Sequence, residues 1–157
     1  MTTRCIHAVK GLWVVLLLLL AVGCAGPRGL VEHGFTFDFL SDSPEAELLD
    51  YRYGQSNYGR SEKKSLGRVS PGRGIYGDIR RGDDLYVQWR LKSTGEVFED
   101  TVDLKRRLPA DIEGCRIYFM VRGPQLYVYL IMPQRRAPDE PRNGPIQTQY
   151  LKTLTLY

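Results

Sequence analysis

Apolar and polar residues alternate most regularly in the stretch LYVQWRL, residues 85–91, and this stretch decides the fold class of the chain. Leu85, Val87 and Trp89 fall on one side, and polar or amphipathic residues fall between them. Successive side chains of a strand point to opposite faces of a sheet, so this pattern is typical of a strand with one buried face. The stretch therefore predicts a β-strand that packs on a core through its odd-numbered residues.

A hairpin is predicted where this strand ends. The triplet Ser93-Thr94-Gly95 has the composition of a turn. Segment 97–104 then alternates again, with Phe98, Val102 and Leu104 on one side and polar residues on the other. Two alternating runs joined by a short turn indicate an antiparallel hairpin.

A second hairpin is predicted for residues 117–130, with Arg122-Gly123-Pro124 at its turn. Both arms carry apolar or aromatic residues on both faces, and such strands are covered on both sides. We therefore expect this hairpin to lie at the centre of the fold. One face carries Ile117, Phe119, Val121, Leu126, Val128 and Leu130, and the other carries Tyr118, Tyr127, Tyr129 and Ile131.

Four further segments show strand patterns. Residues 35–39 and 49–53 alternate with period two, and residues 147–157 are rich in Thr, Tyr and Leu. Residues 74–79 add a short edge strand. The fold class predicted for the chain is therefore all-β.

Helices have little support in the sequence, because no stretch carries a sustained apolar stripe with a period of 3.6 residues. Short helical turns are predicted at 43–47 and 111–113. Residues 54–82 and 133–145 are rich in glycine or proline and in basic side chains, which indicates long loops. We expect an antiparallel β-sandwich or twisted meander with long basic loops and at most short helical turns.

The first residues have the composition of an export signal. Arg4 and Lys10 make a positive start, residues 12–22 are an uncharged apolar run, and small residues lead into Cys24. The run has eleven residues, and a transmembrane helix needs about 20. A plain signal peptide that is cut at another position is the remaining alternative.

Cys24 is placed as in the bacterial lipoprotein pattern, which this leader resembles. In that pattern the chain is cut before the cysteine, and the cysteine is then acylated. We predict a signal peptide over 1–23, a lipidated tether over 24–34 and a single β domain over 35–157. Two or more acyl chains hold a protein firmly to a membrane. Ala25 follows the cysteine, and by resemblance to enterobacterial sorting rules this favours the periplasmic face of the outer membrane.

Charge and cysteine content narrow the choice of partners. Arg4 and Lys10 leave with the signal, so the mature chain has 20 basic against 18 acidic residues, a net charge of +2. That balance favours no polyanionic partner, and we predict no nucleic acid. Cys5 also leaves and Cys24 carries lipid, so Cys115 has no disulfide partner. We expect Cys115 to be a half-buried small residue.

Two short motifs have structural explanations. Residues 72–77, GRGIYG, match the dinucleotide fingerprint G-x-G-x-x-G, which needs a strand before it and a helix after it. Pro71 precedes the motif and a β pattern follows it, so we interpret it as a glycine-rich loop. The tripeptide at 81–83, RGD, is interpreted as a turn that leads into the next strand.

Catalytic groups are sparse. His33 is the single histidine of the mature chain, and no strand-to-helix nucleophile elbow surrounds the nearby Ser41 and Ser43. Glu99 and Asp100 are adjacent on a predicted strand and so point to opposite faces. One histidine and one free cysteine are too few for a transition-metal site. We predict no enzyme activity, no cofactor, no metal and no small-molecule substrate.

The basic loop is the most distinctive predicted surface. Arginine and tyrosine are enriched at binding hot spots, so this loop is the predicted contact with a protein partner. A solvated loop near anionic headgroups is the alternative. The candidate partner-binding residues are Tyr58, Arg60, Lys63, Lys64, Arg68, Arg73 and Tyr76.

Several stretches together resemble a known group of proteins: LYVQWR (85–90), TGEVFEDTVDL (94–104), LP (108–109), IYF (117–119) and QLYVYL (125–130). They are similar to small lipoproteins of Gram-negative bacteria that are encoded beside type VI secretion phospholipase effectors. Those lipoproteins are taken to be immunity proteins, which hold the toxin inactive in the periplasm. The shared residues are mainly strand residues, so they mark a fold more than an activity.

The resemblance implies a function. It implies a periplasm-facing lipoprotein that binds a lipase effector and neutralises it by steric or conformational block. It carries no binding residue over to a position of this sequence. A structural or accessory envelope lipoprotein, which docks onto a secretion or outer-membrane assembly, is the alternative.

Overall fold

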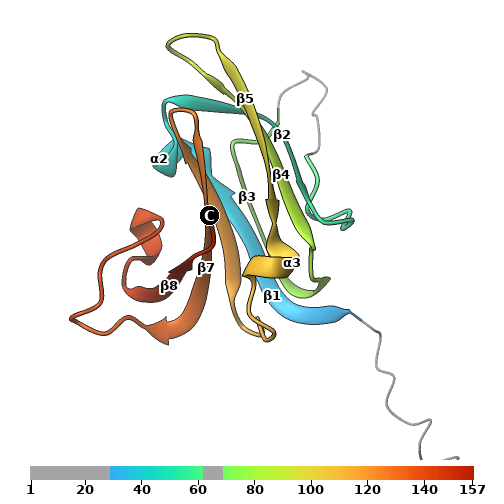
Figure 1. The fold of residues 1–157 in the computed structure, drawn as a ribbon, viewed down its shortest axis with the longest axis vertical. Helices are drawn as coiled ribbons and strands as arrows, with labels where there is room; N and C mark the ends of the chain where they lie inside the picture. The colour runs from blue at the N-terminus through green and yellow to red at the C-terminus, as the bar shows by residue number, and fades with distance from the viewer. Residues whose placement is uncertain (1–28, 62–68) are drawn as a thin grey trace, which may run out of the picture.

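The computed structural model describes residues 29–61 and 69–157, and within them the chain is built almost entirely of β-strands (Figure 1). The strands are β1 (Leu30–Asp38), β2 (Ala46–Tyr53), β3 (Gly72–Arg80), β4 (Asp84–Leu91), β5 (Val97–Asp103), β6 (Arg116–Arg122), β7 (Gln125–Arg135) and β8 (Leu151–Thr155). The short helices are α2 (Phe39–Asp42), α3 (Leu104–Arg107) and the 3-10 turn η1 (Ile146–Thr148).

The strands form two sheets, one with the order β3-β1-β6-β7-β8 and one with the order β2-β4-β5. Neighbouring strands are antiparallel, except that β1 and β6 run parallel. A parallel pair needs a long crossover, and here the crossover contains β3 and the whole three-stranded sheet. The predicted all-β, sandwich-like fold is confirmed.

Aromatic side chains fill the space between the sheets. Phe35 stacks on Tyr53 with ring centroids 4.8 Å apart, and Phe37 lies 4.7 Å from both Tyr51 and Phe119. These rings come from β1 and β6 of one sheet and from β2 of the other. Each such pair contributes about 0.5–1.5 kcal/mol beyond the area that it buries. The cluster therefore holds the two sheets together.

Both predicted hairpins are present. In β4–β5, Leu85 pairs with Val102 and Trp89 with Phe98, so the predicted apolar side faces the core. In β6–β7, Gly123 at φ +55 allows a turn of two residues. The β6–β7 hairpin lies inside the five-stranded sheet with both faces buried, as its pattern predicted.

Helical turns lie elsewhere than the sequence predicted. Residues 43–47 do not form a helical turn, because Ala46 already begins β2. The turn lies earlier, at α2, where the Asp38 carboxylate caps the N–H groups of Leu40 and Ser41. Residues 111–113 hold no helix either, and α3 forms at Leu104–Arg107.

Strand boundaries also differ from the prediction. The alternation expected for 49–53 would put Leu49 in the core. A β-bulge between Leu48 and Asp50 puts Leu48 on the core side instead, and Leu49 is only partly buried. The predicted final strand over 147–157 is reduced to β8 by η1, which precedes it.

The two predicted loops are shorter than expected. The predicted edge strand at 74–79 is part of β3, which pairs with β1 over nine positions. The GRGIYG motif of residues 72–77 therefore lies in an extended strand and not in a loop. Pro133 belongs to β7, so the second loop begins after Arg135.

Candidate functional site

Four of the predicted site residues lie outside the described part of the chain: Cys24, Lys63, Lys64 and Arg68. The other predicted residues do not share one surface. Tyr58 is exposed in the loop after β2, and Arg60 follows it. Arg73 and Tyr76 belong to β3 of the other sheet.

Segment 59–61 pairs with β2 and so places Arg60 on the three-stranded sheet. The N–H of Tyr53 donates to the Gly59 carbonyl at 2.6 Å, and the N–H of Ser61 donates to the Tyr51 carbonyl at 3.0 Å. Arg52 and Arg60 are therefore opposite each other across an antiparallel bridge. Segment 59–61 extends this sheet beyond β2.

Arg73 and Tyr76 point to different sides of β3. Arg73 is the register partner of the buried Phe37, and its Nη1 lies 3.5 Å from the Arg60 carbonyl oxygen. Tyr76 is the register partner of Gly34 and lies on the opposite face of the strand. The structure therefore brings Arg60 and Arg73 together and separates Tyr76 from them.

The outer face of the three-stranded sheet carries a polar network that the sequence analysis missed. Arg52 Nη2 lies 3.0 Å from Asp84 Oδ2, and its guanidinium lies over the Tyr86 ring, 5.9 Å from the centroid. The Tyr86 hydroxyl donates to Glu99 at 2.8 Å, and the Gln88 amide donates to the same carboxylate at 3.1 Å. Desolvation and the bond to Glu99 raise the pKa of Tyr86. The network links β2, β4 and β5 side by side.

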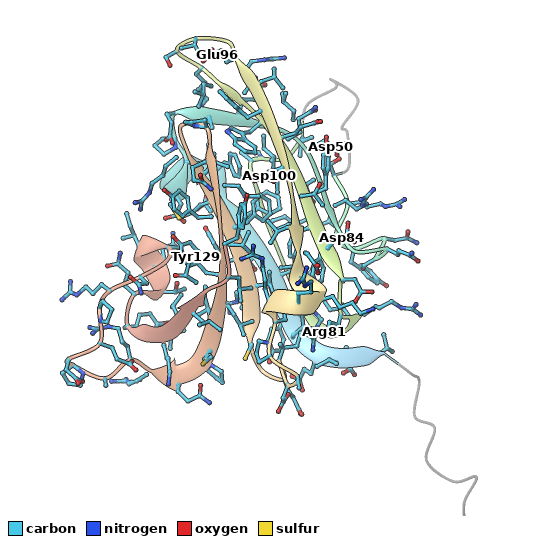
Figure 2. All side chains as sticks on the ribbon, viewed as in Figure 1. Asp50, Arg81, Asp84, Glu96, Asp100 and Tyr129 are labelled. Atoms are coloured by element: carbon cyan, nitrogen blue, oxygen red, sulfur yellow. The ribbon has the colours of Figure 1, made fainter. Side chains whose placement is uncertain are left out.

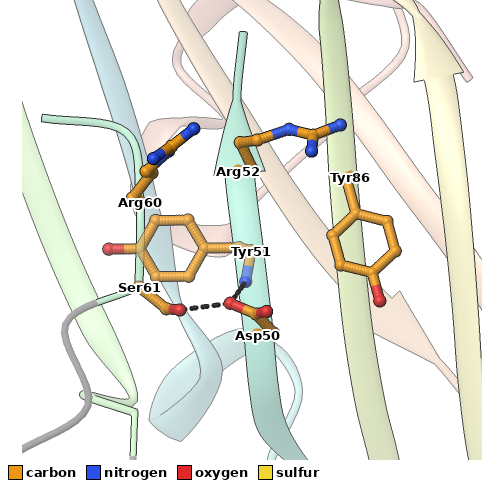
Figure 3. A pocket seen from close by; sticks show the side chains of 6 residues that line it. All are labelled: Asp50, Tyr51, Arg52, Arg60, Ser61 and Tyr86. Carbon is orange, nitrogen blue, oxygen red and sulfur yellow. Dashed lines mark hydrogen bonds between the residues drawn. The ribbon is translucent and has the colours of Figure 1, made fainter. Parts of the chain in front are cut away.

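Three hollows that share lining residues follow one another over the outer face of β2 and the β3–β4 turn, and together we call them the β2 trough. Figure 3 shows one end of it, where Asp50 accepts hydrogen bonds from the Ser61 hydroxyl and from the Tyr51 N–H. Figure 2 shows Asp50 and Asp84 on this side of the molecule, away from Tyr129. The residues that line the trough are Asp50, Tyr51, Arg52, Gly54, Gln55, Arg60, Ser61, Arg80, Arg81, Asp83, Asp84 and Tyr86.

His33 has a structural role. It is fully buried, with Nδ1 2.8 Å from the Val31 carbonyl oxygen and Nε2 2.9 Å from the Tyr53 hydroxyl. A carbonyl only accepts, so Nδ1 carries the proton and Nε2 accepts from Tyr53. Burial lowers the pKa of His33, and burial raises the pKa of Tyr53 to about 12. The ring is therefore neutral and fixed in the core.

The two serines near His33 in the sequence have other partners. The Ser41 hydroxyl donates to Asp38 at 2.7 Å, and the Ser43 hydroxyl accepts from the Val121 N–H at 2.9 Å. Among residues 29–61 and 69–157, no group of three or more His, Cys, Asp or Glu side chains is placed to hold a metal ion. Cys115 is buried, and burial raises the pKa of its thiol.

The RGD tripeptide forms a structural turn between β3 and β4. Arg81 donates to the carbonyls of Leu108, Pro109 and Ala110, which fastens the turn to the segment after α3. A Cβ on Gly82 would lie 2.5 Å from the Tyr53 ring, so this close approach requires glycine.

Comparison with known proteins leaves the family of this chain open. No helix of the described residues is long and apolar enough to cross a membrane. No protein-family model, no curated protein and no solved structure matches the chain. A proposal for its function therefore rests on the sequence patterns, the fold and the β2 trough.

Proposed function

We propose that this chain is a lipid-anchored envelope protein, and that its β domain binds a type VI secretion lipase effector in the periplasm and neutralises it. The leader and Cys24 support the anchor. The sequence resemblance supports the class of partner. The β domain contributes a surface on which a protein can dock.

The observation that carries the binding role is the outer face of the sheet β2-β4-β5. Its charged side chains are exposed but held in place: Arg52 is bonded to Asp84, and Glu47 is bonded to Arg90. Groups that are already ordered lose less entropy when a partner binds. A face of this kind suits a protein surface with complementary charges.

The position of the tether distinguishes the two ends of the domain. β1 begins at Leu30, beside the β3–β4 turn and α3, and the β4–β5 hairpin tip lies at the far end of the molecule (Figure 1). Five residues, 25–29, separate Cys24 from β1 and reach at most about 18 Å. In an anchored domain the β3–β4 turn therefore lies at the tether end and the β4–β5 hairpin tip lies at the opposite end. The hairpin tip is then the part of the sheet β2-β4-β5 that reaches farthest from the anchor.

Co-purification tests this proposal. The genes beside this one are searched for a lipase effector, the full chain is produced with that effector, and the complex and the remaining lipase activity are measured. We expect a stable complex and strong loss of activity. Absence of both the complex and the inhibition refutes the proposal.

The anchor is tested separately. Metabolic labelling with palmitate is expected to mark the wild type and not Cys24→Ser. Fractionation is expected to place the wild type in the outer membrane. An unlabelled wild type in the cytosol contradicts the anchored location.

An accessory envelope lipoprotein is the second candidate, since a tethered, exposed sheet face also suits an assembly component. Deletion separates the two. Loss of an immunity protein causes intoxication by sister cells, whereas loss of an assembly component impairs secretion or envelope integrity in isolated cells.

A further inference from the structure

Two arginines on neighbouring segments line the same hollow of the β2 trough. Arg52 and Arg60 are bridge partners, and both line the hollow drawn in Figure 3. Like charges directly opposite each other on neighbouring strands destabilise a sheet. An anion in the hollow that both arginines line would offset this repulsion by attractive contacts with them.

The carboxylates near the trough neutralise only part of the positive charge of Arg52 and Arg60. Asp84 is bonded to Arg52 at 3.0 Å, and Asp50 lies at the other end of the hollow, where it accepts from Ser61 and from the backbone (Figure 3). Within residues 29–61 and 69–157, no carboxylate lies within ion-pair distance of the Arg60 guanidinium. Counting the described residues alone, the Arg60 end of the trough therefore carries an excess of positive charge.

We propose that Arg52 and Arg60 together bind a carboxylate from an acidic segment of the protein partner, and that this segment lies along the β2 trough. The inference rests on the proposed binding function and names its contact surface. Guanidinium groups match carboxylates with paired hydrogen bonds. Arg80 lines the far end of the trough together with Asp83 and Asp84, so a second acidic residue of the same segment would have to contact the Arg80 guanidinium there.

The charge on the rest of this face favours a protein segment over an anionic membrane. Asp84, Glu99 and Asp103 lie on the same side of the sheet as Arg52. A membrane surface is negative over its whole area and would bring these carboxylates against like charge. A single extended segment of a protein would contact the trough and leave the rest of this acidic face in solvent.

A peptide titration tests the site without the natural partner. The probe is acetylated, amidated hexaglutamate, added to the full chain in a zwitterionic detergent, with the arginine Nε–H signals followed by NMR. We expect saturable shifts at Arg52 and Arg60 that weaken with added salt. The double variant Arg52→Gln/Arg60→Gln is expected to lose about fivefold or more in affinity.

Arg90→Gln is the matched control. Arg90 lies on the same face, its side chain is 45% exposed against 47% for Arg52, and each arginine has one carboxylate partner. We expect this variant to bind hexaglutamate as the wild type does. Unchanged amide spectra establish that each variant is folded.

Three outcomes overturn the inference: no shift at Arg52 and Arg60, an equal loss in Arg90→Gln, or shifts caused by dihexanoyl phosphatidylglycerol in place of hexaglutamate. The effector complex gives a separate result. If the wild type binds the effector and Arg52→Glu/Arg60→Glu binds it equally well, the trough is refuted and the proposed function stands. If no effector complex forms at all, the proposed function fails and the titration still decides whether the site exists.

Discussion

The outer faces of the two sheets differ in what covers them. Over β6 and β7 the outer face carries Tyr118, Met120, Tyr129 and Ile131, which are all buried. The segment between β7 and β8 lies over them, with Gly144 against the Tyr129 ring. The outer face of β2, β4 and β5 carries exposed charged and polar side chains instead.

This difference indicates that one outer face contributes to the stability of the fold and that the other is available for binding. An apolar outer face has to be buried by the chain itself, and here the C-terminal segment buries it. A polar face stabilises the fold little and is free to contact a partner. We therefore expect substitutions on the covered face to change stability, and substitutions on the open face to change binding.

The largest expected effect is on the free energy of unfolding, when a lysine is introduced on the covered outer face and, for comparison, on the open outer face. Met120 is 2% exposed, so Met120→Lys buries an ammonium group in the apolar cluster of the covered face. We expect it to lower the free energy of unfolding by about 3–5 kcal/mol. Gln88→Lys places the same charge on the open face near Glu99. This variant should change the free energy of unfolding by about 0.5 kcal/mol or less. Urea unfolding, followed by Trp89 fluorescence, measures both. If both variants lost the same free energy of unfolding, the two outer faces would not differ in their contribution to stability.

A smaller effect is expected where the covering segment is fastened. Asp42 accepts from the Tyr118 hydroxyl at 2.5 Å and from the Ile146 N–H at 3.3 Å. Asp42→Ala leaves both donors without this acceptor, which costs about 1–3 kcal/mol. We expect faster hydrogen exchange in residues 136–150, and Glu45→Ala, which removes an exposed carboxylate nearby, serves as control. Unchanged exchange in Asp42→Ala would show that the segment is held by other contacts.

Stability is expected to depend on pH through His33. Its pKa is lowered in the folded state, whereas an unfolded histidine takes up a proton below about pH 6.5. The unfolded state therefore binds more protons, and stability falls as the pH drops from 7.5 to 5.5, by at most about 1.4 kcal/mol per pH unit. Urea unfolding at each pH should show this slope in the wild type and a shallower one in His33→Gln. If that variant does not fold, the imidazole C2–H signal of His33 in the wild type gives the same information. A midpoint above 6.5 would contradict the prediction.

The smallest effect is expected on the open face. Arg52→Ala and Arg90→Ala each remove one half-exposed ion pair. Such pairs contribute about 0–1 kcal/mol, so both variants should unfold within about 0.5 kcal/mol of the wild type. Urea unfolding at low and high salt measures this. A loss of several kcal/mol in either variant would mean that the network is part of the folding core.

Local patterns predicted those parts of the fold that depend on neighbours in sequence. The alternation of residues 85–91 predicted β4, and the two apolar faces of residues 117–130 predicted the central hairpin, because each side chain's face follows from its position in the strand. The bulge at Leu48 and the strand β3 at Gly72–Arg80 depend on pairing with β4 and β1. Such pairing is not visible in the local pattern.

The candidate site was predicted less well than the fold. Arg60 was predicted as a surface residue from composition, but its neighbour Arg52 was not, because their contact arises when segment 59–61 adds to β2. Arg73 joins Arg60 from the other sheet, and Tyr76, three residues later, points away. Arg73 and Tyr76 were predicted to share one site, but they lie on opposite faces of β3, because side chains alternate between the two faces along a strand.

By itself, the sequence determined that this chain forms strands, which of their faces are apolar, and that residues 1–24 have the composition expected of an export signal. These properties follow from side-chain chemistry and local spacing. Only the tertiary structure decided that β1 pairs in parallel with β6, that His33 is held by Tyr53, and that Arg52 meets Arg60. Each of these contacts joins residues that lie far apart in the chain or across a loop, so strand pairing and packing in the folded chain bring them together, and local spacing does not.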